Sequence, residues 1–307
     1  MRVGGLWLSI GVAVSAYAAE AFAEAPRCEP RLHAKEVRVA MRGPELIHAR
    51  LAALDTRRNP ERRAALAELF SEVGCPEQMD TPVVRGRPDN LVCRLPGTLP
   101  RRILVGAHFD QTGPGRGIVD NWSGASMLAN LVEGLLPVER RHEFLFVGFS
   151  AEEEGLVGSR AYVRSMTEQD RAQLAAMVNI DSIGMGPLRI EMRFSDDRLV
   201  CEYLTAQALL KQPAGALNFG FGISSDFEPF RRAAIPTLNF TSYHRDWQEI
   251  LHQRRDQLSE IDRDAYYASY RSIAMTLAVL DANLSREASP PAAAEKSAER
   301  QGETAVP

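Results

Sequence analysis

The stretch ILVGAHFDQTGPGRGIVDNWSGASMLANLVEGLL (residues 103–136), followed by HEFLFVGFSAEEEGLVGSRAY (residues 142–162), decides the fold. Two apolar runs, Ile103–Ala107 and Phe144–Phe149, each end in residues that can bind metal. His108 follows the first run, Glu152–Glu154 follow the second, and Asp120 stands between them before a helix-like segment. Open α/β sheets bind their ligands at the carboxyl ends of the strands. The stretch therefore predicts an active site there, and so an enzyme.

Apolar runs alternate with helical patterns on both sides of this stretch. Strands are expected at residues 81–84, 90–95, 102–107, 143–149, 176–180, 188–192 and 235–240. Helices are expected at residues 44–54, 60–73, 123–136, 156–165, 167–175, 196–210, 227–232 and 261–284. The near-continuous apolar run at 143–149 is typical of a sheet covered on both faces. This alternation predicts an α/β protein: a three-layer α/β/α sandwich with a mixed, mostly parallel central sheet.

The composition is that of an ordinary globular protein of 307 residues, with 45% hydrophobic and 25% charged residues. The formal net charge is -4, and no basic stripe is concentrated in one place, so we expect no nucleic-acid partner. Arginine pairs are scattered, and we interpret them as solvated surface. They occur at positions 57–58, 62–63, 101–102, 140–141, 231–232 and 254–255.

The two ends of the chain differ from its middle. Arg2 and the apolar run Leu6–Ala19 resemble an export signal, and Ala21-Phe22-Ala23 fits a small-x-small cleavage site. We therefore predict a signal peptide at 1–23, export to the periplasm or the medium, and no stable membrane span after cleavage. A retained anchor is the alternative. Residues 286–307 offer almost nothing to bury and are expected to be disordered.

Four cysteines, at positions 28, 75, 93 and 201, lack the close spacing of a zinc-thiolate site. Export makes disulfides possible. Cys75 ends a helix-turn pattern and Cys93 lies in an expected strand, so this pair is the first candidate for a bridge. Four cysteines allow three full pairings, so the sequence leaves the choice open.

Histidines and carboxylates gather at or just beyond the expected strand ends. Carboxylate oxygens with imidazole nitrogens suit zinc, and less selectively cobalt or manganese. A carboxylate between two ions about 3.5–4 Å apart can bridge them. The adjacent pair Glu152-Glu153 allows one carboxylate to bind metal while the other acts as general base. The candidates are His108, Asp110, Asp120, Glu152, Glu153, Asp181 and His252.

Six sequence blocks, in order, resemble a known family. They are AHFD, GPG…IVDNWSG, FSAEEEGLVGS, NIDSIG, SSDFEPF…IPT and HQRRDQLSEID, and they span roughly residues 45–284. Together they are similar to the co-catalytic dizinc aminopeptidases of metallopeptidase family 28, of which glutaminyl cyclases are distant relatives. The resemblance implies a zinc-aminopeptidase-like fold, and we expect a single peptidase domain at 24–285.

The resemblance also implies a role for each candidate. His108, Asp120 and Asp181 would hold one zinc ion. Asp120, Glu153 and His252 would hold the other, with Asp120 bridging, and Co²⁺ or Mn²⁺ could substitute. Glu152 would be the general base, activating a bridging water that attacks the scissile carbonyl. Asp110 would orient His108, and Asp256 is the matching position beside His252.

Two histidines compete for the last ligand position. The block H-x-x-x-D-x-x-x-x-I-D runs from His252 through Asp256, which favours His252 as the ligand. His244 then becomes a substrate-pocket residue or an ordinary loop histidine. Phe227 follows Ser225-Asp226 where the family often has histidine, which leaves the substrate preference open.

The expected activity is removal of N-terminal residues from peptides that have a free N-terminus. Three alternatives remain open. One is a glutaminyl-cyclase-type acyltransferase with one zinc ion, another is a carboxypeptidase-type member of the family, and the third is a catalytically inactive scaffold. The complete ligand set and the intact Glu152 argue for the hydrolase. The oligomeric state, the preferred residue and the physiological substrate do not follow from the sequence.

Overall fold

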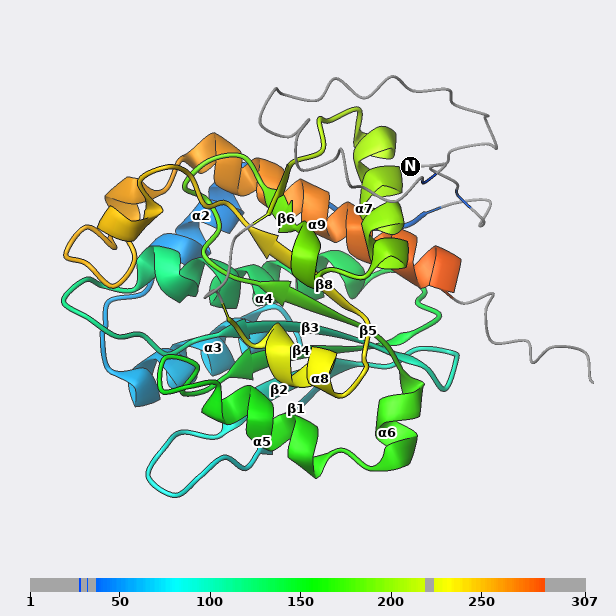
Figure 1. Cartoon of the computed structure of the whole chain (residues 1–307), viewed down its shortest axis with the longest axis horizontal. Coiled ribbons are helices and arrows are strands. Elements are labelled where there is room, and N and C mark those ends of the chain that lie inside the picture. The colour runs from blue at the N-terminus through cyan, green and yellow to red at the C-terminus, as the bar shows by residue number, and fades with distance from the viewer. Residues whose placement is uncertain (1–27, 29–31, 33–36, 219–223, 285–307) are drawn as a thin grey trace, which may run out of the picture.

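A twisted sheet of eight strands forms the centre of the part described by the computed structural model, residues 28, 32, 37–218 and 224–284 (Figure 1). The strand order is β1-β2-β4-β3-β5-β8-β6-β7. Strands β4, β3, β5 and β8 run parallel, whereas β1, β2 and β6 each include an antiparallel pairing. The strands are β1 (Glu77–Thr81), β2 (Asn90–Leu95), β3 (Arg102–His108), β4 (Glu143–Phe149), β5 (Leu174–Ile180), β6 (Arg189–Glu191), β7 (Ala216–Leu217) and β8 (Thr237–Thr241).

Helices cover both faces of this sheet (Figure 1). One face carries α2 (Pro44–Ala52), α3 (Asn59–Glu72), α4 (Ser123–Leu135), α7 (Asp197–Leu210) and α9 (Arg263–Asn283). The other face carries α5 (Val157–Ser165) and α8 (Phe227–Arg232), and the short α6 (Glu168–Gln173) precedes β5. This is the predicted three-layer α/β/α sandwich with a mixed, mostly parallel sheet.

Alternating side chains of the strands separate two buried clusters. Ile103 and Val105 of β3 face the cluster under α3, α4 and α9, whereas Leu104 faces the cluster under α5 and α8. Helix α4 is buried on nearly every side, because it lies between the sheet and the outer helices. Ile47 of α2 and Phe70 of α3 belong to the same cluster as the sheet, as expected for helices that pack onto it.

Three local expectations were wrong. The strand expected at 81–84 lies earlier, at Glu77–Thr81, because its residues pair with Arg94 back to Asn90 of β2. Strand β5 begins at Leu174, where the expected helix had not yet ended. Arg62 is not at the surface: its side chain is fully buried, which is unusual for arginine.

The strand order determines where a site can form. The chain passes from β3 to β4 on one side and then to β5 on the other side of β3. The carboxyl ends of these three parallel strands therefore meet at a topological switch point, where open sheets of this kind bind ligands. His108 is the last residue of β3, and Asp181 directly follows β5.

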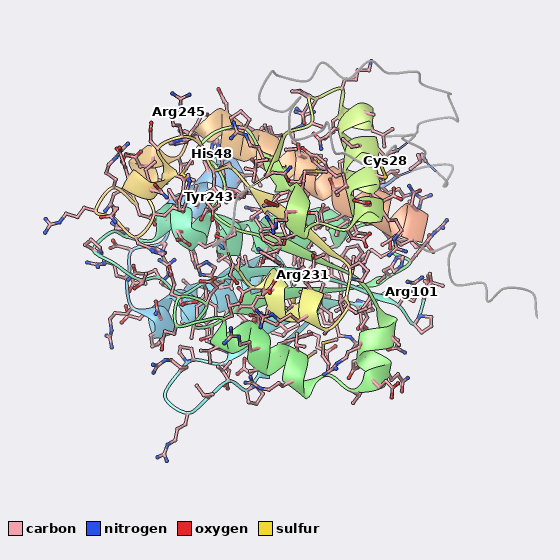
Figure 2. All side chains as sticks on the ribbon, viewed as in Figure 1. Cys28, His48, Arg101, Arg231, Tyr243 and Arg245 are labelled. Carbon is pink, nitrogen blue, oxygen red and sulfur yellow. A yellow bond between two sulfur atoms is a disulfide. The ribbon has the colours of Figure 1, made fainter. Side chains whose placement is uncertain are left out.

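Two disulfides join the four cysteines. Cys75 bonds to Cys93, the pair first expected, and Cys28 bonds to Cys201 of α7 (Figure 2). The predicted signal peptide and disordered tail lie outside the described residues. Within the part that the structure covers, no helix combines the length and the apolar character needed to cross a membrane.

Candidate metal centre

Two groups of metal-binding side chains lie side by side at the carboxyl end of the sheet. The first contains His108, Glu152 and Asp181, and the second contains Asp120, Glu153 and His252. Within each group the possible ligand atoms all lie within 4.8 Å of one another. The structure thus brings together all five predicted ligands and the predicted base from five separate segments of the chain.

Asp120 stands between the two groups. Its Oδ1 lies 3.2 Å from His108 Nε2, and its Oδ2 lies 3.0 Å from His252 Nε2. His252 Nε2 is also 3.0 Å from Glu153 Oε2, and His108 Nε2 is 3.7 Å from Asp181 Oδ1. One carboxylate that presents an oxygen to each side has the arrangement needed to bridge two ions.

An irregular turn holds Asp120 in place. Within Ile118–Trp122, the backbone of Asp120 (φ -112°, ψ 96°) and of Asn121 (φ -135°, ψ 44°) is not helical, and the Asp120–Asn121 peptide bond is cis. Gly117, which precedes the turn, has φ 62°, a conformation that suits glycine. The Asn121 amide Nδ2 donates to Ile180 O at 2.9 Å, and its Oδ1 accepts from Ser182 N at 3.1 Å. Asn121 therefore ties the Asp120 turn to the residues on either side of Asp181.

Two further carboxylates support the groups from behind. Asp110 accepts the backbone N–H of Glu152 at 3.0 Å and that of Glu153 at 3.2 Å. It thus anchors the turn that carries both glutamates. His108 Nδ1 lies nearer to the backbone oxygen of Asp110 (3.2 Å) than to its carboxylate (3.6 Å). Both contacts can orient the ring, as ligand histidines usually require.

Asp256 occupies the matching position on the other side. Its Oδ1 accepts the N–H of Val119 at 2.7 Å, and its Oδ2 accepts the N–H of Asp120 at 3.3 Å. Its predicted role was to support His252, but its hydrogen bonds go to the backbone of the Asp120 turn. Burial raises the pKa of Asp256 to about 7, and its backbone hydrogen bonds oppose this rise.

The competing histidine, His244, belongs to neither group. Its Nδ1 accepts the backbone N–H of Asp246 at 3.1 Å, which stabilises its own loop. The neighbouring Tyr243 stacks on Trp247, with ring centroids 5.0 Å apart, and Figure 2 shows Tyr243 and Arg245 on the same side of the molecule. The structure therefore brings His252, rather than His244, to the other candidate ligands.

Burial and crowding shift the protonation of these groups strongly. Burial raises the pKa of Glu152 well above its usual range, and the Asp226, Asp181 and Asp120 carboxylates raise it further, although His108 opposes them. Burial would also raise the pKa of Asp120, but hydrogen bonds with both histidines outweigh it and lower that pKa. Hydrogen bonds to Asp120 and Glu153 raise the pKa of His252 to about 10.

These shifts describe a set of buried carboxylates that needs positive charge. Divalent cations bound there would supply it with the histidines neutral. Glu153 Oε1 is buried without a hydrogen-bond partner, so one oxygen of the second group remains available for a cation. The oxygen and nitrogen donors are those that zinc binds. The residues present therefore fit divalent cations such as zinc.

Sequence reasoning missed two residues that shape the site. No role in the metal site was predicted for Asn121, and Arg62 was interpreted as part of a surface pair. The position of Asn121 beside a candidate ligand was a usable signal for its role. No local pattern distinguishes Arg62 from the other paired arginines, because its contacts lie 47 to 55 residues away.

Comparisons with known proteins identify the family of this chain. Residues 90–277 match the sequence model of a protein family described as Peptidase family M28. Aminopeptidase YwaD of Bacillus subtilis is 28% identical over 173 residues, which are 54% of this chain and 38% of that protein. The chain thus matches little more than a third of that relative's length.

Solved structures show the same fold. BSAP, described as a zinc aminopeptidase from Bacillus subtilis, aligns with a TM-score of 0.56 at 23% identity, covering 62% of this chain and 49% of that one. A glutaminyl cyclase from an Acidobacteriales bacterium aligns with a TM-score of 0.65 at 15% identity, covering 82% of this chain and 99% of that one. Since the family match spans more than half of the sequence, this chain belongs to peptidase family M28.

Proposed function

We propose that this chain is an exported zinc aminopeptidase that uses two metal ions. The observation that carries the proposal is the pair of adjacent ligand groups with Asp120 between them. Membership of peptidase family M28 and the aminopeptidase names of relatives support hydrolysis of peptides at a free N-terminus.

In this proposal His108, Asp120 and Asp181 hold one ion, and Asp120, Glu153 and His252 hold the other. Zinc ions bound there would polarise the scissile carbonyl and lower the pKa of a water between them. The grouping of Glu152 with His108 and Asp181 supports a role for its carboxylate at the water that the ions would activate.

Glu152 is the proposed general base. It accepts the proton of the attacking water and then donates it to the leaving amine. The burial that raises its pKa brings the group toward the pH at which it can both take and give a proton. Asp110 positions this carboxylate by accepting the N–H groups of Glu152 and Glu153.

The surplus of carboxylates also favours a substrate with a free α-amine. Asp226 lies near Glu152 and Asp181 but belongs to neither ligand group, so its carboxylate would remain without a bound ion and would attract a substrate ammonium group. A blocked N-terminus lacks that charge.

A second candidate is a glutaminyl-cyclase-type acyltransferase. The alignment that covers 99% of a known glutaminyl cyclase favours it, although at 15% identity the likeness concerns the fold alone. A one-ion enzyme would need only one of the two groups, and both are present here. We therefore rank the hydrolase first.

We further propose that residues 24–285 are one peptidase domain, exported to the periplasm or secreted. The two disulfides support an oxidising compartment, since such bonds are rare in the cytosol. Sequencing the N-terminus of the protein recovered from outside the cytoplasm tests this, and a retained residue 1 would contradict cleavage after residue 23.

A substrate panel tests the activity. Aminoacyl-p-nitroanilides with free amines should be hydrolysed, whereas their N-acetyl forms and the C-terminal residues of blocked peptides should not. Cleavage of only the blocked substrates would overturn the aminopeptidase assignment. Cyclisation of an N-terminal glutamine without nitroanilide hydrolysis would favour the acyltransferase.

Glu152→Gln tests the general base within the same panel. We expect turnover to fall by about 10²–10⁴-fold while metal content stays unchanged, because the amide cannot accept the proton. Glu154→Gln is the matched control, since Glu154 is exposed and pairs with Arg87. Near-normal turnover in Glu152→Gln would show that the base is another group.

A further inference from the structure

Arg62 is a buried cation, and the packing of its helix does not explain why a charged side chain lies there. It lies on α3, and its side chain is fully buried. Burying a charge is costly unless it is compensated. No carboxylate of the described residues forms an ion pair with it. The cation must therefore be compensated in another way.

Three backbone carbonyls supply that compensation. The guanidinium donates Nε–H to Phe109 O, Nη1–H to Arg116 O at 3.0 Å and Nη2–H to Gly117 O at 2.8 Å. It also lies over the Trp122 ring, 5.6 Å from the ring centroid. A planar fork with five N–H donors can make these bonds together, whereas a lysine ammonium, with its donors on one nitrogen, cannot.

These carbonyls lie at the two ends of one loop. Phe109 directly follows the candidate ligand His108, and Gly117 directly precedes the turn that carries Asp120. Trp122 ends that turn. The guanidinium therefore ties together the ends of the 109–117 loop, beside two ligands whose facing atoms are 3.2 Å apart.

The charge of Arg62 acts on the same site. Burial lowers its pKa to about 10, and the carboxylates of Asp110, Asp256, Asp120 and Glu153 limit that fall. Arg62 therefore remains a cation at neutral pH. Its charge alone would repel a divalent ion, whereas its hydrogen bonds would hold the ligands in place. The two effects predict opposite results when the side chain is removed.

We propose that Arg62 is a positioning residue of the metal centre, which fixes the spacing of His108 and Asp120 by clamping the ends of the 109–117 loop. This inference rests on the proposed metal site. It assigns a role at that site to the lead helix α3, which lies outside the residues 90–277 that match the family.

Two variants of Arg62 separate the clamp from the charge. Arg62→Met removes both, and Arg62→Lys keeps the charge but loses the fork. We expect both to weaken Zn²⁺ binding by about 10–100-fold in a chelator competition, the scale observed when supporting groups of metal ligands are lost. Their Co²⁺ complexes should also show an altered visible absorption spectrum, because the ligand geometry changes.

Arg50→Met is the matched control. Arg50 is a buried arginine of the neighbouring helix α2 and bonds to Glu72, Glu133 and Asn130, away from the metal ligands. We expect this variant to lower the melting temperature of the metal-free protein and to leave Zn²⁺ affinity and the Co²⁺ spectrum unchanged.

Wild-type or tighter Zn²⁺ binding by Arg62→Met would overturn the proposal, as would wild-type binding by Arg62→Lys, since charge alone would then suffice. If Arg50→Met lost as much Zn²⁺ affinity as the Arg62 variants, the loss would come from general destabilisation, and the proposal would also be overturned. If Arg62→Met fails to fold, the Zn²⁺ affinity of Arg62→Lys is compared with that of Arg50→Met, and a weaker affinity of Arg62→Lys supports the proposal. If the wild-type protein binds no zinc, the proposed function fails rather than the clamp.

Discussion

The two halves of the metal centre are built in different ways. The strand-end half consists of His108 and Asp181, which directly terminate or follow central parallel strands, and the His108 side chain is 2% exposed. The loop half consists of Glu153 and His252. The His252 side chain is 52% exposed, and its backbone has φ 60° on the segment between β8 and α9.

This difference indicates that different parts of the fold hold the two halves of the metal centre. Neighbouring strands on both sides of β3 fix the strand-end half, so its geometry depends on the core. The loop half depends on local contacts, since the His252 ring lies against the carboxylates of Asp120 and Glu153 on an exposed loop. We therefore expect the strand-end half to bind metal more tightly and the loop half to be the part that can be lost separately.

Removing His108 should have the largest effect. His108→Ala deletes a ligand and leaves buried carboxylates without a cation, so both ions should be lost. We expect peptidase turnover to fall by more than about 10³-fold. Metal analysis of the purified variant checks this. Retention of two ions per chain would show that metal binding does not depend on the strand-end half.

Removing His252 should have a smaller and separable effect. His252→Ala should lose one ion and keep the other, with turnover reduced by about 10²–10³-fold. The melting temperature of the metal-free protein should change little, because substitutions of exposed side chains rarely alter stability by more than about 0.5 kcal/mol. Loss of both ions in this variant would remove the distinction between the halves.

A supporting carboxylate should have the smallest effect of the three. Asp256→Asn retains the shape but offers one acceptor oxygen where the Val119 and Asp120 N–H groups use two. We expect metal affinity to fall by about 10–100-fold, measured by chelator competition. Asp262→Asn, which changes the N-cap of α9, is the control and should bind metal normally. Equal affinities for wild type and Asp256→Asn would contradict a role for this carboxylate.

Much of the fold could be predicted from the sequence, because its strands and helices carry clear periodic patterns. The apolar run Phe144–Phe149 indicated a strand covered on both sides, which β4 is. The strand expected at 81–84 was misplaced, since β1 carries polar and exposed residues and is defined by its pairing with β2. Such pairing is a tertiary property that no local pattern contains.

The candidate ligands were also recognisable, because they follow predicted strands and stand in a family-like order. The structure gathers them into two groups, and their catalytic roles stay predictions. Arg62 could not be recognised, since its partners are backbone carbonyls of a distant loop. Asp110 was expected to orient His108, whereas its two hydrogen bonds to the Glu152–Glu153 turn were not expected, because they depend on how β3 and β4 align.

Zinc titration of the metal-free protein tests the central claim most directly. Bound zinc and hydrolysis of a free-amine nitroanilide are measured together as zinc is added. Two ions per chain should bind, the first more tightly, with full activity only after the second. Full activity with one ion per chain, or binding of a single ion only, would contradict a site made of two ligand groups that share Asp120.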